Sequence, residues 1–86
     1  MWIILAYDIN EKRVNNVYKI CSKYLVRVQK SVFIGEIGWA NLKILKRSLE
    51  EKIILNEDSI QIFIMRDEKL VKRLKIGISY EFSNII

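Results

Sequence analysis

One carboxylate stands where a short apolar strand should end. Residues 2–7 form an apolar run, and Asp8 follows directly, just before a segment with helical spacing. A carboxylate in this position can simply be the residue that begins a turn. It can also bind a hard cation, because Mg²⁺ takes one or two carboxylates together with waters and phosphate oxygens. A twofold axis near the strand end would bring a second Asp8 to such a site.

A second set of polar residues lies on the expected extended segment 26–34, which is either one strand or two strands around Lys30. Arg27, Gln29, Ser31 and Phe33 occupy every second position and so share one face of an extended chain, whereas the other face carries Val26, Val28, Val32 and Ile34. This pattern is typical of a solvated strand face, with Phe33 in the core. It also fits a phosphate site in which Arg27 and Ser31 contact the backbone and Phe33 stacks on a base or packs at a subunit interface.

Basic residues gather in the first part of the chain. Lys12, Arg13, Lys19 and Lys23 lie at and along the first expected helix, and residues 1–35 carry +4 of the net charge of +5. With a pI near 9.5, the chain has the charge of a nucleic-acid binder, although such charge also serves solubility. Arg13 falls in the first helical turn, where a cation opposes the helix dipole, so a phosphate or Asp8 is its expected partner.

The residue types exclude several chemistries. The 86 residues include no histidine, which removes histidine bases, Ser–His and Cys–His nucleophiles and His-ligated zinc. Cys21 is the only cysteine, has core spacing, and can form neither an intrachain disulfide nor a cysteine cluster. We therefore expect a cytoplasmic protein whose chemistry depends on oxygen ligands. No apolar run approaches the length of a membrane span or has the flanks of a signal peptide.

The hydrophobic pattern predicts one α+β domain over residues 1–86. We expect a strand at 2–7 that is buried on both faces, a helix of about 13 residues capped by Asn10, and the extended segment 26–34. A helix at 39–52 capped by Gly38, a turn at 56–58 and a strand at 59–65 follow, and residues 75–79 look extended. With both helices on one face, this order gives a ferredoxin-like βαββαβ sandwich. The other sheet face would be apolar and open, so a homodimer packed sheet to sheet is expected.

Three segments of the sequence resemble the CRISPR-associated protein 2 family, the small subunit of the spacer-acquisition module. The first is Leu5-Ala6-Tyr7-Asp8-Ile9, followed shortly by an arginine. The second is Arg27-Val28-Gln29-Lys30-Ser31-Val32-Phe33-Ile34-Gly35-Glu36-Ile37, and the third is Asp58-Ser59-Ile60-Gln61-Ile62-Phe63. The spacing of the first two segments is the more specific part of this resemblance.

The resemblance implies a ferredoxin-like homodimer in which a C-terminal strand and tail, residues 65–86, reach the partner protomer. Such a dimer bridges two dimers of the CRISPR integrase, CRISPR-associated protein 1, and holds a DNA fragment for insertion. Members are also described as endonucleases dependent on Mg²⁺ or Mn²⁺ that act on single-stranded RNA or duplex DNA. By the same resemblance, Asp8 is the metal ligand, and the other positions associated with nuclease function are Tyr7, Arg13, Arg27 and Phe33.

Two functions from different classes therefore stay open. The first is a structural subunit of an integration complex, for which Asp8 is dispensable. Its expected contacts to the DNA backbone are Lys12, Arg13, Lys19, Lys23, Arg27 and Ser31. The second is a metal-dependent nuclease acting on phosphodiester bonds. The sequence favours the first, since one carboxylate per protomer with no other candidate base is a thin catalytic site.

Overall fold

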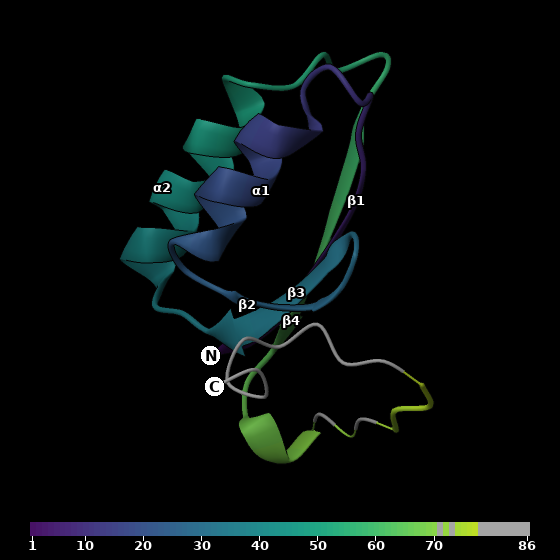
Figure 1. Ribbon diagram of the computed structural model, residues 1–86. Helices are drawn as coiled ribbons and strands as arrows, with labels where there is room; N and C mark the ends of the chain where they lie inside the picture. Colours follow the sequence, from purple (N-terminus) through teal and green to yellow (C-terminus); the bar gives the residue numbers. More distant parts are fainter. Residues whose placement is uncertain (71, 73, 78–86) are drawn as a thin grey trace.

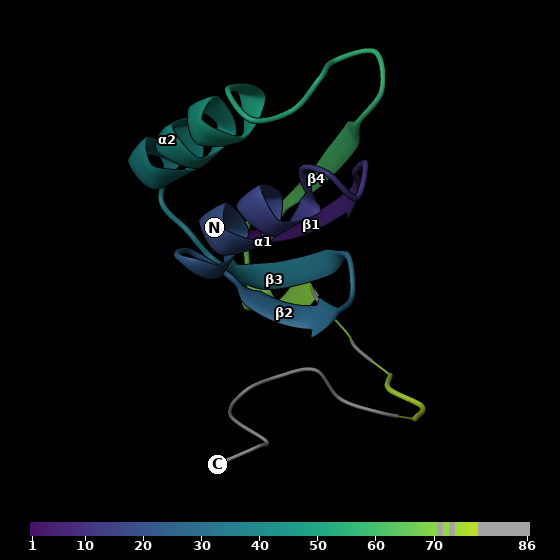
Figure 2. The same ribbon diagram turned by 45° about the horizontal axis from the view of Figure 1, so that its top comes forward.

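A four-stranded antiparallel sheet carries two helices on one of its faces (Figures 1 and 2). The computed structural model describes residues 1–70, 72 and 74–77. The elements are β1 (Trp2–Asp8), α1 (Val14–Ser22), β2 (Val26–Gln29), β3 (Val32–Glu36), α2 (Trp39–Glu50) and β4 (Ser59–Met65), followed by a 3₁₀ turn at Glu68–Leu70. The sheet order is β2-β3-β1-β4. The predicted α+β, ferredoxin-like architecture is thus confirmed.

Strand β1 is central because it pairs with β3 on one side and with β4 on the other. Its side chains alternate. Ile3, Leu5 and Tyr7 are buried beneath the helices, whereas Trp2 and Ile4 are only half-buried on the opposite face. The prediction that this strand is buried on both faces is therefore wrong for the described chain, because both helices cover the same side of the sheet.

Helix α1 is shorter than its pattern predicted. It begins at Val14 rather than directly after Asn10, and it has nine residues instead of about 13. Asn10 still opens the segment: its side-chain oxygen accepts the Lys12 amide at 2.9 Å, and its carbonyl accepts the amides of Arg13 and Val14. The three residues after Asn10 form a turn because these bonds close locally before regular helix begins.

The segment 26–34 is two strands, β2 and β3, joined by a turn at Lys30 and Ser31. A bulge interrupts the pairing, so Arg27 lies opposite Phe33, but Gln29 lies opposite Val32. One extra residue in a strand reverses the alternation of the side chains that follow. The expected single stripe of Arg27, Gln29, Ser31 and Phe33 is therefore corrected: Arg27 and Phe33 share the helix side, and Gln29 does not join them.

Helix α2 and strand β4 lie where their periodicity placed them. Gly38 caps α2, as predicted, with extended backbone, and the helix buries Leu42, Leu45 and Leu49 against the sheet. The helix ends at Glu50, two residues before the expected end. The core between helices and sheet consists of Ile3, Leu5, Tyr7, Val17, Cys21, Leu25, Phe33, Ile37, Leu42, Leu45 and Leu49.

The expectations for the C-terminal part are tested only in places. Within the predicted range 65–86, Met65 ends β4, Glu68–Leu70 form a 3₁₀ turn and residues 75–77 form no strand. The rest of the predicted strand and tail, at residues 71, 73 and 78–86, lies outside the described part of the chain. Among the described residues, no helix is long and apolar enough to cross a membrane.

Two leucines make a matched test of this core. Leu5 is fully buried, whereas Leu55 is 80% exposed. Leu5→Ala should lower the free energy of unfolding by about 2–5 kcal/mol, because it removes apolar contacts and leaves a cavity. Leu55→Ala should change it by less than about 0.5 kcal/mol. Urea denaturation followed by circular dichroism measures both, and equal losses would contradict the assignment of this core.

Candidate nucleic-acid and metal site

Asp8 is exposed at the end of β1, on the sheet face that the helices leave open. It lies opposite Ser59, the first residue of β4. Together with Ala6, Tyr7 and Gln61, these two residues line a shallow hollow of about 250 Å³. Asp8 thus lies at a strand end, as the sequence predicted. The structure adds the hydroxyl of Ser59 and the amide of Gln61, both on β4, beside this carboxylate.

These ligands suit Mg²⁺ or Mn²⁺ only in part. Asp8 contributes one carboxylate, while Ser59 and Gln61 are neutral oxygen donors on the adjacent strand. Within the described chain, no three His, Cys, Asp or Glu side chains are grouped so that they could hold a metal ion. A hard cation here would therefore need phosphate oxygens, waters or a second protomer to complete its coordination.

Tyr7 and Phe33 lie on the other side of the sheet from Asp8. Tyr7 is buried, its hydroxyl donates to the Lys30 carbonyl at 3.4 Å, and burial raises the pKa of this hydroxyl. Phe33 is fully buried, with ring centroids 6.1 Å from Tyr7 and 5.8 Å from Tyr18. The expectation that Phe33 stacks on a base or packs at a subunit interface is thus corrected: its ring is a core residue.

Arg27 lies on the same helix side of the sheet. Its guanidinium carbon is 5.3 Å from the centre of the Tyr18 ring, a cation–π distance. The residue is half-buried, and its Nε is shielded from solvent. Ser31 is also half-buried, and its carbonyl accepts the Tyr7 amide at 3.0 Å. The structure therefore places both residues around the buried aromatic rings rather than beside the Asp8 carboxylate.

Arg13 pairs with Asp58 and not with Asp8. Its Nε donates to Asp58 Oδ2 at 2.6 Å and its Nη2 to Oδ1 at 2.9 Å, a two-pronged ion pair, with Glu57 at 3.3 Å. The expectation of a phosphate or Asp8 as the partner of Arg13 is corrected by this geometry. An arginine whose donors already face a carboxylate has little left to offer to a DNA backbone.

Asp58 was expected only as part of the turn at residues 56–58, but in the structure it is a buried acid with several hydrogen-bond donors around it. Its side chain is fully buried, and it also accepts the backbone amides of Asn10 at 3.0 Å and Ile54 at 2.9 Å. Hydrogen bonding to Arg13 is the main cause that holds the pKa of this carboxyl well below its usual range. No local sequence pattern predicts this ion pair, because Arg13 and Asp58 are 45 residues apart in the chain.

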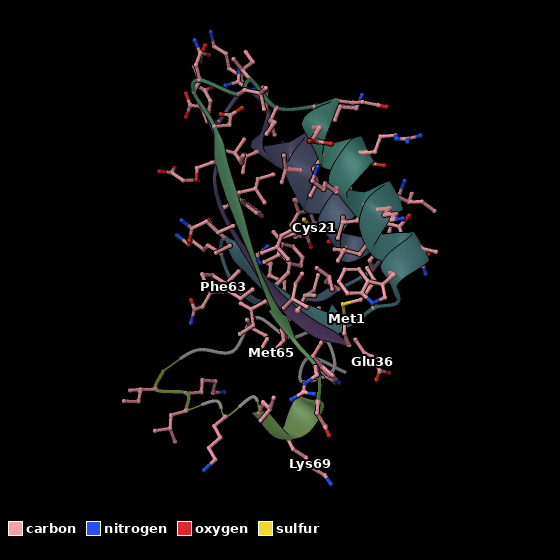
Figure 3. The ribbon with its side chains drawn as sticks, turned by 180° about the vertical axis from the view of Figure 1, so that it is seen from behind. Met1, Cys21, Glu36, Phe63, Met65 and Lys69 are labelled. Atoms are coloured by element: carbon pink, nitrogen blue, oxygen red, sulfur yellow. The ribbon has the colours of Figure 1, made fainter. Side chains whose placement is uncertain are left out.

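The remaining predicted contacts, Lys12, Lys19 and Lys23, are exposed on and around α1. They therefore lie on the helical layer, away from the open face that carries Asp8 (Figure 2). Cys21 points inward, between α1 and the sheet (Figure 3), and burial raises the pKa of its thiol to about 12. This agrees with the expectation of an inert core cysteine.

Fold and site together define a class of protein: a small ferredoxin-like domain with an exposed carboxylate at the end of its central strand and a basic helical surface. The family model of CRISPR associated protein Cas2 matches residues 1–73. The chain belongs to this family.

Individual relatives agree with that assignment. The chain is 42% identical over 78 residues to the CRISPR-associated endoribonuclease Cas2 of Dictyoglomus turgidum, covering 91% of this chain and 90% of the relative. It is 37% identical to the protein of the same name from Thermotoga maritima, with the same coverage. Among solved structures, Streptococcus pyogenes Cas2 aligns with a TM-score of 0.74 at 30% identity, covering 87% of this chain and all of that one. A further Cas2 crystal structure aligns with a TM-score of 0.85 at 34% identity, covering 93% of this chain and 90% of the other.

The Arg13–Asp58 ion pair makes the free energy of unfolding depend on pH in the acidic range. Because the folded-state pKa of Asp58 is lowered, its contribution is complete above the ordinary carboxyl pKa of about 4 and is lost as the pH falls below it. Asp58→Asn should therefore have a clearly lower free energy of unfolding than the wild type at pH 7. The difference between the two free energies should become smaller at pH 3. Urea unfolding at both pH values measures it.

Glu57→Gln is the control, because Glu57 is half-exposed and its contact with Arg13 is the longer one. It should leave stability nearly unchanged at both pH values. A gap between wild type and Asp58→Asn that stays constant from pH 7 to pH 3 would contradict the assigned role of Asp58.

Proposed function

We propose that this chain is a structural subunit of the CRISPR adaptation complex, in which a homodimer bridges two dimers of the integrase Cas1 and binds duplex DNA. The observation that carries the proposal is the solitary Asp8 carboxylate. Within the described residues, the hollow that it lines contains no second acid and no base. A site of this kind is poorly equipped for hydrolysis on its own, whereas a binding subunit does not need it.

The open sheet face supports the dimer. Ile34, Ile4 and Phe63 lie in one row across β3, β1 and β4, and Phe63 is 53% exposed. Figure 3 shows Phe63 on the side of β4 away from the helices. Val26 and Trp2 add to this patch, and a second copy of the same face would remove it from water. Asp8 is on this face too, so such packing could bring two copies of it together.

The charge of the helical layer supports binding to a DNA backbone. Lys12, Lys19 and Lys23 are exposed, and none of them is in an ion pair within the described part of the chain. Lysines that neutralise phosphates release counterions, which gives affinity without sequence preference. Binding of this kind suits a subunit that must hold DNA fragments of any sequence. The same role implies a cytoplasmic location.

The second candidate is a metal-dependent endoribonuclease, and the names of the relatives favour it. In this function Asp8 holds a Mg²⁺ or Mn²⁺ ion together with phosphate oxygens of the RNA. The bound ion supplies activation of water and neutralisation of charge on the phosphate. Two Asp8 carboxylates across a dimer axis would repel each other without a cation, so the ion would also stabilise the interface.

A charge placed on the open face tests the dimer. Phe63→Asp should sediment as a monomer near 10.2 kDa, because a carboxylate would have to be buried unpaired in the interface. Ile44→Asp is the matched control, since Ile44 is 51% exposed but lies on α2, and it should stay dimeric like the wild type. Dimerisation of Phe63→Asp at wild-type strength would contradict the packing of sheet on sheet.

Spacer integration in vitro with Cas1 separates the two functions. Asp8→Ala should integrate DNA at the wild-type rate if the chain is a structural subunit. A folded, dimeric Asp8→Ala protein that fails to integrate would instead make the metal site part of the mechanism.

The variant Lys19→Glu/Lys23→Glu should weaken duplex binding for all sequences alike. It should also reduce the salt slope of binding by about 0.9 for each phosphate that the variant no longer neutralises.

A further inference from the structure

An exposed tryptophan begins a ridge on the outer surface of α2. Trp39 is the first residue of this helix, and its side chain is 63% exposed. The core side of the helix is formed by Leu42, Leu45 and Leu49, so Trp39 does not contribute to that apolar stripe. A large aromatic ring left in water at the start of a polar helix face is unexplained by the packing of this domain.

Two cations continue the ridge at helical spacing. Lys43 and Arg47 follow Trp39 at steps of four residues, so the three side chains succeed one another about 6 Å apart along the axis. Both cations are exposed, and neither is in an ion pair within the described residues. The neighbouring Lys46 differs, because it pairs with Glu50 at 3.0 Å.

The ridge has clear ends. Before its first turn, Gly38 borders a hollow that Lys23 lines together with the acid Glu36, and Trp39 does not belong to this lining. Beyond Arg47, the acids Glu50 and Glu51 make the surface unfavourable for an anion. The ridge is thus a short track of one aromatic ring and two cations.

This track stays accessible in the proposed dimer. Helices α1 and α2 lie side by side on one face of the sheet, and their outer surfaces point away from the open face (Figures 1 and 2). A second copy seated on the open face would leave both tracks in water on opposite sides of the assembly. The track is also separate from the hollow that Asp8 lines.

We propose that this ridge, Trp39, Lys43 and Arg47, binds single-stranded nucleic acid. An unpaired base stacks on the Trp39 ring, and the following phosphates contact Lys43 and Arg47. Aromatic rings combined with cations are the general means of holding single strands, since every base has a face that can stack. A duplex keeps its base faces inside the helix, so it would use the cations but not the tryptophan. This is a second surface, independent of duplex binding around α1 and of chemistry at Asp8.

Tryptophan fluorescence tests the stacking directly. Trp2→Phe leaves Trp39 as the only tryptophan in the chain. Titration of this protein with a 12-nucleotide oligo(U) or oligo(dU) should quench the emission of Trp39, and the ribose and deoxyribose arms show which backbone is preferred. If Trp2→Phe does not fold, anisotropy of a labelled oligonucleotide with the variants below gives the same decision.

Substitutions along the ridge give the second readout. Trp39→Leu should weaken single-strand binding roughly tenfold, and Trp39→Phe should restore part of the loss because its ring still stacks. Lys43→Glu/Arg47→Glu should abolish binding at moderate salt. The matched control is Arg66→Glu/Lys69→Glu, which makes the same change of charge at two exposed residues after β4. Figure 3 shows Lys69 well away from the helices. The control should bind several-fold more tightly than the ridge variant.

The outcomes decide the proposal without involving the proposed function. It is overturned if saturating oligonucleotide leaves the emission of Trp39 unchanged, or if the ridge variant binds single strands no worse than the control. It is also overturned if Trp39→Leu affects duplex and single strand equally. Loss of single-strand binding with duplex affinity and integration retained supports the ridge as a separate site.

Discussion

The Asp58 carboxylate ties together the two loops that lie at the Asp8 end of the sheet. This carboxylate accepts hydrogen bonds from Nε and Nη2 of Arg13, at the start of α1. It also accepts the backbone amide of Asn10 in the loop after β1 and the backbone amide of Ile54 in the connection before β4. A buried carboxylate requires this many donors, because an unpaired charge inside a protein is very costly. The same bonds fix how β1 ends and β4 begins, which sets Asp8 beside Ser59. The candidate site is therefore held by a residue that does not belong to it.

The sheet has two unlike faces, and this difference organises the rest of the molecule. One face buries Ile3, Leu5 and Phe33 under the helices, and the other presents Ile4 and Phe63 partly to solvent. A chain of this size buries a modest share of its surface, so covering the second face adds much to its stability. In the proposed dimer, the position of Asp8 on that open face would link any chemistry it performs to the assembly of protomers.

The cations fall on a different surface from the carboxylate. Lys19 on α1, Lys23 directly after it, and Lys43 and Arg47 on α2 are exposed on the helical layer. In the proposed function, phosphate binding and any coordination of a metal would therefore lie on opposite sides of the domain. This separation agrees better with a subunit that holds nucleic acid than with a nuclease whose cations would surround its metal.

The elements whose signal is local could be predicted from the amino-acid sequence alone. The leucine spacing of α2, the alternation of β4 and the apolar run of β1 each reflect contacts between near neighbours on one face. The order of these elements then allowed the ferredoxin-like fold and the strand-end position of Asp8 to be predicted. Features that depend on partners far apart in the chain became visible only in the folded structure. Arg13 forms its ion pair with Asp58, an acid 45 residues away. A single bulge in β2 separates Arg27 from Gln29, although the two were expected to share one face of the strand. Phe33 lies in the core because β3 is paired so that this residue faces the helices beside Leu5, a register that β3 alone does not specify.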